Sequence, residues 1–197
     1  MLDAAYWNDL YLKGDTGWDK GAPSPPLVRL LREGIVPKGG SIAVIGAGRG
    51  HDAIEAARQG YRVTAVDFAP EAIKGIRENA ARAGVQLDAR EQDVFDLDGP
   101  FDGILEHTCF CAIDVARRAE YVDTVFHALR PGGVLFGLFY AHGKEGGPPF
   151  DTSEAEVRDL FAPHFHIQRL VRAPDSFEAR AGKELEFVFR RLSSPGT

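Results

Sequence analysis

A glycine-spaced turn is the first stretch of the sequence whose residue types suit ligand binding. In the segment VIGAGRGHD, an apolar run breaks into Gly46, Gly48 and Gly50. Because glycine has no Cβ, the backbone of such a turn can approach a bound molecule closely. The turn could hold the phosphates of a dinucleotide or the amino-acid tail of S-adenosylmethionine (SAM). The dinucleotide fingerprint G-x-G-x-x-G has a glycine where this chain has His51, so the glycines alone do not decide between them.

Three carboxylates follow the glycine turn, each near the end of a predicted strand. They are Asp67, Asp93 and Glu106. Ligands of open α/β sheets bind outside the carboxyl ends of the strands, so these side chains are expected at one edge together with the turn. Asp67 could accept hydrogen bonds from ribose hydroxyls of either cofactor. Asp93 could bond an adenine amino group that Val94 covers, and Glu106 could bond the ammonium of a methionine tail. The last two carboxylates therefore favour SAM.

Strands and helices alternate through the middle of the chain. The expected strands are 41–46, 61–67, 85–91, 101–107 and 134–140, and the expected helices between them are 52–59, 70–83 and 116–129. This order predicts a parallel sheet with helices on both faces. Helix 153–161 follows, and strands 165–171 and 185–192 are joined by a loop alone, which is typical of antiparallel pairing. The sequence thus predicts an α/β, Rossmann-like fold with a seven-stranded, mostly parallel sheet and an antiparallel C-terminal hairpin.

The first 40 residues differ from the rest and are interpreted as an arm. They contain both tryptophans, Trp7 and Trp18, and three prolines between positions 23 and 26 that break any long helix. A second helix is expected to begin at Leu27. We expect residues 1–197 to form one domain, with residues 1–40 as a lid over the cofactor.

Composition limits the partners of the chain. It has 197 residues and a formal net charge of −6, which argues against broad contact with nucleic acid or an anionic membrane surface. No apolar run approaches the ~20 residues of a membrane span. The N-terminus has no signal-like apolar block, so a cytoplasmic protein is expected. A monomer that binds a small-molecule substrate is the default expectation.

Two cysteines, Cys109 and Cys111, follow the fourth predicted strand. On an extended segment, cysteines two residues apart are not expected to bond to each other. Two thiols are too few for a structural zinc site, so no metal is predicted. Buried, small apolar side chains are the simplest interpretation of both.

Three further motifs accompany the glycine turn: TGWDKG-x-P-x-P in the arm, CFCAI after the fourth strand and GGPPF after the fifth. Together they resemble the thiopurine S-methyltransferase family of class I SAM-dependent methyltransferases, and within it the branch of halide and thiol methyltransferases. The resemblance covers nearly the whole chain. It implies the Rossmann-like class I methyltransferase fold and SAM as the cofactor, with S-adenosylhomocysteine (SAH) as the product.

The resemblance also implies roles for individual residues. The implied cofactor-binding residues are Tyr11, Trp18, Gly46, Ala47, Gly48, Asp67, Phe68, Asp93, Val94, Glu106 and His107. The implied substrate-side residues are Tyr140, Pro149, Phe150 and Arg180. Thiopurine enzymes commonly carry an arginine at the place of His107. Its absence here argues against a bulky purine-like anion as the substrate.

Methyl transfer from a sulfonium is an in-line displacement in which the protein aligns the reactants and excludes water. A thiol titrates near ~8.5 and needs no strong activation, whereas an alcohol or amine needs a base. Tyr140, at the end of the fifth predicted strand, is the candidate for handling a proton. We therefore predict methyl transfer to a small soft nucleophile: a thiol, sulfide, halide or thiopurine-like sulfur. The alternatives are a small-molecule O- or N-methyltransferase, an NAD-dependent oxidoreductase and a non-catalytic SAM-binding protein.

Overall fold

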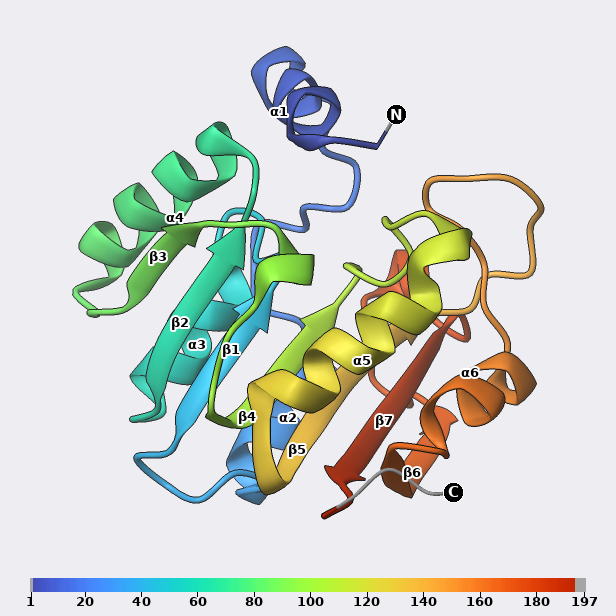
Figure 1. Cartoon of the computed structure of the whole chain (residues 1–197). Helices are drawn as coiled ribbons and strands as arrows, with labels where there is room; N and C mark the ends of the chain where they lie inside the picture. The colour runs from blue at the N-terminus through green and yellow to red at the C-terminus, as the bar shows by residue number, and fades with distance from the viewer. Residues whose placement is uncertain (1, 194–197) are drawn as a thin grey trace.

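The computed structural model describes residues 2–193, which fold around a seven-stranded sheet (Figure 1). Its strands are β1 Ser41–Ile45, β2 Arg62–Asp67, β3 Asp88–Glu91, β4 Phe101–His107, β5 Leu129–Tyr140, β6 Phe165–Arg172 and β7 Glu184–Arg191. The strand order is β3-β2-β1-β4-β5-β7-β6. The pairs among β1 to β5 are parallel, and β7 runs antiparallel to both β5 and β6. The predicted parallel sheet with an antiparallel C-terminal hairpin is confirmed.

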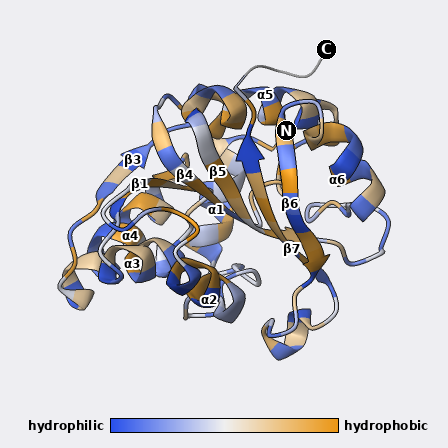
Figure 2. Ribbon diagram, turned by 90° about the horizontal axis from the view of Figure 1, so that it is seen from below, coloured by the Kyte–Doolittle hydropathy of each residue, from blue (hydrophilic) through white to orange (hydrophobic). Residues whose placement is uncertain are grey.

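Helices cover both faces of the sheet. They are α1 Ala4–Lys13, α2 Pro25–Glu33, α3 His51–Arg58, α4 Pro70–Ala83, α5 Arg118–Ala128 and α6 Glu154–Phe161, with short 3-10 turns η1 Val94–Asp96, η2 Val115–Arg117 and η3 Glu178–Arg180. Residues of α2, α3 and α4 share one buried apolar cluster, and residues of α5 and α6 share another on the opposite face. Figure 2 shows the hydrophobic colours concentrated in the strands between these layers. Among residues 2–193, no helix is long and apolar enough to cross a membrane.

Helix α4 shows how local sequence sets the boundaries of these elements. Pro70 stands in its first turn, where a missing N–H costs nothing. Ile73 and Ile76 lie three residues apart and are buried on the face turned to the sheet. Gly84 ends the helix in the left-handed conformation, with φ of 66°, and its N–H bonds the carbonyls of the last turn. The predicted bounds of this helix are confirmed.

Several boundaries differ from the prediction. Helix α2 begins at Pro25 rather than at Leu27, because proline is tolerated in a first helical turn. Strand β3 begins at Asp88, three residues later than expected. Strand β5 begins at Leu129 rather than at 134, so the segment RPGG lies within it as an irregularity. Phe101 pairs with Leu129 and Gly103 with Val134, so the intervening residues of β5 bulge out of the ladder.

The arm places α1 over the edge at which the parallel strands end (Figure 1). The Asp3 carboxylate caps α1 by accepting a hydrogen bond from the Tyr6 backbone N–H. Asn8 on α1 accepts a hydrogen bond from the backbone N–H of Glu71 on α4, at 2.9 Å. The aromatic side chains of the arm pack with Phe68 and with alanines at the start of α4 in a third apolar cluster. The arm therefore covers the edge of the sheet near the carboxyl ends of β1 and β2.

Candidate active site

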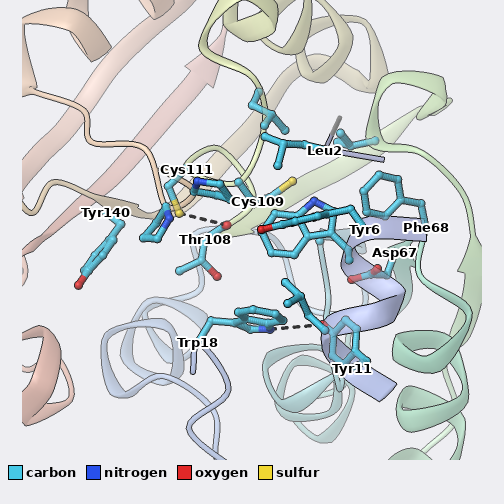
Figure 3. A pocket seen from close by; sticks show the side chains of 18 of the residues that line it. Leu2, Tyr6, Tyr11, Trp18, Asp67, Phe68, Thr108, Cys109, Cys111 and Tyr140 are labelled. Atoms are coloured by element: carbon cyan, nitrogen blue, oxygen red, sulfur yellow. Dashed lines mark hydrogen bonds between the residues drawn. The ribbon is translucent and has the colours of Figure 1, made fainter. Parts of the chain in front are cut away.

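A cavity of about 570 Å³ lies between the arm and the carboxyl edge of the sheet. Cavities of about 300–1,000 Å³ accommodate small ligands and cofactors. Trp7, Tyr11 and Trp18 line it from the arm, and Asp67 and Phe68 line it from the end of β2. In Figure 3, Asp67 and Phe68 lie at one end and Tyr140 and Cys111 at the other, with Thr108 and Cys109 between them. The cavity thus has two ends with different side chains.

Asp67 joins the glycine turn to the cavity. Its Oδ2 accepts a hydrogen bond from the Gly48 N–H at 2.9 Å, and its Oδ1 accepts one from the Ala69 N–H at 3.0 Å. Burial raises the pKa of Asp67 to about 6, although the backbone N–H donors act in the opposite direction. A carboxylate held in this way keeps acceptor capacity for hydroxyl groups in the cavity.

The glycine turn leaves no room for side chains. Gly46 lines the cavity with φ of 56°, and a Cβ there would lie 2.8 Å from the Cβ of Cys109. A Cβ on Gly48 would approach the Tyr11 hydroxyl to 3.3 Å. Gly48 itself is not among the lining residues. Neither is Ala47, whose N–H donates to the Val66 carbonyl at 3.0 Å. Of the three predicted turn residues, only Gly46 contributes to the wall.

Asp93 and Val94 both line the cavity, as does the neighbouring Phe95. The Asp93 carboxylate caps η1 by accepting a hydrogen bond from the Phe95 N–H at 3.1 Å. The Arg117 guanidinium lies over the Phe95 ring, 3.4 Å from its centroid. The sequence did not predict the roles of Phe95 and Arg117, because nothing in their local sequence indicates this contact across the cavity wall.

The aromatic residues of the arm contact one another above Asp67. Trp18 and Trp7 pack edge to face with ring centroids 5.3 Å apart, and the Trp18 indole N–H donates to the Tyr11 hydroxyl at 3.4 Å (Figure 3). Burial and the charge of Asp67 raise the pKa of Tyr11. Tyr11 is therefore a neutral phenol at physiological pH. The predicted residues Tyr11 and Trp18 line the cavity, and Trp7 joins them.

Glu106 is not in the cavity, where the sequence predicted it. Its side chain is fully buried, and its Oε1 accepts hydrogen bonds from the backbone N–H groups of Cys109 and Phe110 at 2.8 and 3.0 Å. The Tyr121 hydroxyl donates to its Oε2 at 2.6 Å. Burial raises the pKa of Glu106 to about 7, against these hydrogen bonds. In this structure Glu106 holds the turn after β4 through these hydrogen bonds.

His107 is also outside the cavity, on the opposite face of β4 from Glu106, because successive side chains of a strand alternate. Its Nδ1 lies 2.8 Å from Oδ2 of Asp52, and its Nε2 lies 2.8 Å from Nη1 of Arg180. Burial disfavours the charged ring, but Asp52 and Glu184 outweigh it and raise the pKa of His107 to about 9. A pKa of about 9 favours a doubly protonated ring at neutral pH, but Nη1 of Arg180 can only donate and lies 2.8 Å from Nε2. Because this contact requires a lone pair on Nε2, we assign the neutral ring with its proton on Nδ1, donated to Asp52.

The segment after β4 is a turn, and the extended conformation expected for it is wrong. Both cysteines are buried and free, and both line the cavity. The Cys111 thiol donates to the Thr108 carbonyl at 3.2 Å. Thr108, which also lines the cavity, has φ of 66°, a conformation that β-branched residues rarely adopt. Such strain is concentrated at functional sites, and no local sequence signal announced it.

The other substrate-side residues surround Tyr140. Pro149 and Arg180 line this end of the cavity together with Tyr140, whereas Phe150 does not. The N–H of Phe150 donates to the Cys111 carbonyl at 2.7 Å, so Phe150 supports the wall from behind. The Arg180 guanidinium lies 5.5 Å from the centroid of the Tyr140 ring. The Tyr140 hydroxyl points away from Thr108 and Cys111 in Figure 3.

The buried thiols are expected to be unreactive in the folded chain. Burial raises the pKa of Cys111 to about 12 from 9.0, and burial also raises the pKa of Cys109. At a fixed pH below both values, raising the pKa of a thiol by three units reduces its thiolate fraction about a thousandfold. We expect iodoacetamide at pH 8 to label the folded chain about a thousandfold more slowly than the guanidinium-unfolded chain, as followed by mass spectrometry. Labelling rates within about tenfold of each other would contradict the burial of both thiols.

Comparison with known proteins identifies the family to which the chain belongs. The profile of the thiopurine S-methyltransferase (TPMT) family matches residues 2–192. The chain belongs to this family. It is a SAM-dependent methyltransferase, and the predicted Rossmann-like fold and cofactor are confirmed.

Individual relatives agree with the family assignment. Thiopurine S-methyltransferase of Bordetella parapertussis is 29% identical over 220 aligned positions, covering 99% of this chain and 100% of that protein. Thiocyanate methyltransferase 1 of Brassica oleracea is 28% identical over 184 positions, covering 90% of this chain and 81% of that protein. The 1,6-didemethyltoxoflavin-N1-methyltransferase of Burkholderia thailandensis, solved with SAH, has a TM-score of 0.78 and 24% identity, covering 98% of this chain and 88% of that chain. At that identity the likeness shows the fold alone.

The residues of the cavity suit this TPMT-family cofactor. The carboxylate of Asp67 suits ribose hydroxyls, and the wall at Gly46 admits close approach of a ligand to the backbone. SAM supplies a methyl group on a sulfonium, which is already a good leaving group. The chain therefore has to hold the reactants in line and keep water out, and the aromatic arm and the turn after β4 are placed for both tasks.

Proposed function

We propose that this methyltransferase transfers the methyl group of SAM to a small soft nucleophile, of which thiols, sulfide, halides and thiopurine-like sulfur are the candidates. Several of its relatives carry the names thiocyanate, thiol and thiopurine methyltransferase, which are consistent with such acceptors, whereas one is named a ubiquinone biosynthesis O-methyltransferase. The acceptor occupies the end of the cavity by Tyr140, Cys111 and Thr108. The cofactor lies toward Asp67.

The side chains of the cavity wall carry this proposal. Among residues 2–193, those lining the cavity include no histidine and no glutamate. Four aspartates line the cavity. Asp67 holds the glycine turn, the carboxylates of Asp93 and Asp114 each cap a 3-10 turn by accepting a backbone hydrogen bond, and Asp15 is an exposed residue of the arm. An alcohol or amine acceptor needs a base close to the reacting atom, whereas a thiol near pKa ~8.5 supplies its own thiolate. The side chains that line the cavity therefore favour a soft acceptor over an alcohol or amine.

We further propose that the arm, residues 1–40, acts as a lid over the cofactor. Its aromatic side chains form one wall of the cavity, and displacing them would open the wall to solvent. Closure of such an element excludes water from the reacting groups and completes the alignment. SAM and SAH would then enter and leave when the arm moves.

A SAM-consumption screen tests the acceptor class. We expect methylated product, identified by mass spectrometry, from thiols, sulfide, iodide or a thiopurine, and none from matched phenols and amines. Product from phenols or amines alone would contradict the proposal and favour the O- or N-methyltransferase alternative. SAH at a hundred times its Kd should add about 2.7 kcal/mol of stability in a thermal melt. Stabilisation without product from any acceptor would instead favour a non-catalytic SAM-binding protein.

A further inference from the structure

The guanidinium of Arg180 is almost entirely committed to other parts of the chain. Arg180 lies in η3, 5% exposed, and its Nη1 donates to His107 Nε2 at 2.8 Å and to Glu184 Oε1 at 3.1 Å. Its Nη2 donates to the backbone carbonyl of Trp18 at 2.9 Å. One side chain therefore joins the C-terminal hairpin, the end of β4 and the arm. The carboxylate of Glu184, itself 1% exposed, balances its charge.

The same network reaches the arm at a second point. The imidazole of His107 connects Arg180 to Asp52 on α3, through contacts of 2.8 Å at each ring nitrogen. The other oxygen of Asp52, Oδ1, accepts a hydrogen bond from the Ser24 backbone N–H at 2.8 Å. The series Arg180–His107–Asp52 thus bonds the arm at Trp18 and at Ser24. We call these three side chains the arm clamp.

We propose that Arg180 is a positioning residue that holds the arm closed over the cavity through Trp18, and that it is not the charge that binds the acceptor. The inference rests on the proposed role of the arm as a lid. Trp18 contributes its carbonyl to the clamp and its indole to the cavity wall, so releasing the carbonyl releases the wall. An acceptor therefore needs no negative group for Arg180, in agreement with a small soft nucleophile.

Lysine at this position separates the two roles. Lysine keeps the positive charge but lacks the planar fork, so it cannot bond Trp18, His107 and Glu184 together. We expect Arg180→Lys and Arg180→Ala to raise the Kd for SAH about tenfold or more, because a hydrogen bond from a charged group is lost. Amide hydrogen exchange across residues 15–24 should accelerate in both variants. Neither measurement requires methyl transfer, so failure of the proposed acceptor class would not affect them.

A second experiment tests whether Arg180 binds the acceptor. Steady-state kinetics with mercaptopropionate and with mercaptoethanol compare a carboxylate-bearing thiol with a neutral one. We expect both Arg180 variants to raise the KM for SAM and to change the KM values for the two thiols by similar factors. If Arg180 binds the acceptor, Arg180→Ala would raise the KM for the carboxylate-bearing thiol alone, Arg180→Lys would restore it, and the Kd for SAH would stay unchanged. That result would overturn the proposal.

A variant at Asp52 keeps the proposal testable if the Arg180 variants fail to fold. Asp52 does not line the cavity, so Asp52→Ala is expected to raise the Kd for SAH and speed exchange at residues 15–24 only through the arm. Arg190→Lys is the matched control, because Arg190 bonds the Gly132 carbonyl at 2.8 Å, away from the cavity, and should leave both readouts unchanged. Unchanged SAH binding in Asp52→Ala together with unchanged exchange would overturn the clamp.

Discussion

Replacing Asp67 with alanine is expected to raise the Kd for SAH by about two orders of magnitude or more. The carboxylate lines the cavity and is 8% exposed. Hydrogen bonds from ribose hydroxyls to a charged acceptor contribute about 1.5–3 kcal/mol each, and about 1.4 kcal/mol is tenfold in Kd. The substitution also frees the N–H groups of Gly48 and Ala69, which loosens the glycine turn. Both effects weaken binding of the adenosine part of SAH.

Isothermal titration calorimetry with SAH measures this change. Asp67→Asn is expected to lie between the wild type and Asp67→Ala, because the amide keeps one acceptor oxygen and loses the charge. Asp98→Ala is the matched control, since Asp98 is exposed and lies outside the cavity. If Asp67→Ala binds SAH within about fivefold of the wild type, the ribose does not meet this carboxylate.

Glu106→Ala and Glu106→Gln are expected to differ sharply in stability. Alanine leaves three buried donors without a partner: the N–H groups of Cys109 and Phe110 and the hydroxyl of Tyr121. An unsatisfied buried group costs about 1–3 kcal/mol, so the free energy of unfolding should fall by about 3 kcal/mol or more. Glutamine can accept both N–H bonds and donate to the Tyr121 oxygen, so at pH 5, where Glu106 is protonated in the folded chain, its loss should stay within about 1 kcal/mol.

The pH dependence of stability distinguishes the charged residue from its amide. Burial raises the pKa of Glu106 to about 7 from 4.5, so the folded chain binds a proton that the unfolded chain releases between these values. Stability from this group is therefore full below pH 4.5 and is lost as the pH rises through 7, by up to about 3 kcal/mol. Glu106→Gln should lack that part of the fall.

Urea unfolding of the wild type and both variants between pH 5 and 8 checks these values. Glu78→Gln is a control for the substitution itself, because Glu78 is exposed on α4. Parallel pH profiles for the wild type and Glu106→Gln would contradict a raised pKa at Glu106. Titration with SAH gives a second readout. Glu106→Gln should bind within a few-fold of the wild type, whereas a tenfold loss would restore Glu106 as a ligand for the ammonium of the cofactor.

Local patterns are enough to predict the sheet and one end of the site. Apolar runs, helix caps and strand order follow from residues close in sequence, and the rule for strand ends placed Asp67 and Asp93 at the cavity. Alternation along a strand limits what the same rule can predict for Glu106 and His107. These residues are consecutive in β4, so both could not face one ligand, and the structure places neither of them in the cavity.

The remaining features depend on contacts that no local pattern reports. The partners of Arg180 include His107 and Trp18, which are 73 and 162 residues away in sequence. The turn after β4, with Thr108 in the left-handed conformation, places Cys109 and Cys111 at the cavity. The buried carboxylate of Glu106 stabilises this turn by accepting hydrogen bonds from the N–H groups of Cys109 and Phe110. Tertiary packing therefore decides the acceptor end of the site.

A crystal structure with SAH tests the central claim most directly. We predict the ribose hydroxyls within hydrogen-bond distance of Asp67, the thioether sulfur directed toward Thr108 and Cys111, and the arm closed by the contact of Arg180 with the Trp18 carbonyl. SAH bound elsewhere, or bound in this cavity with Asp67 turned away from the ribose, would contradict it.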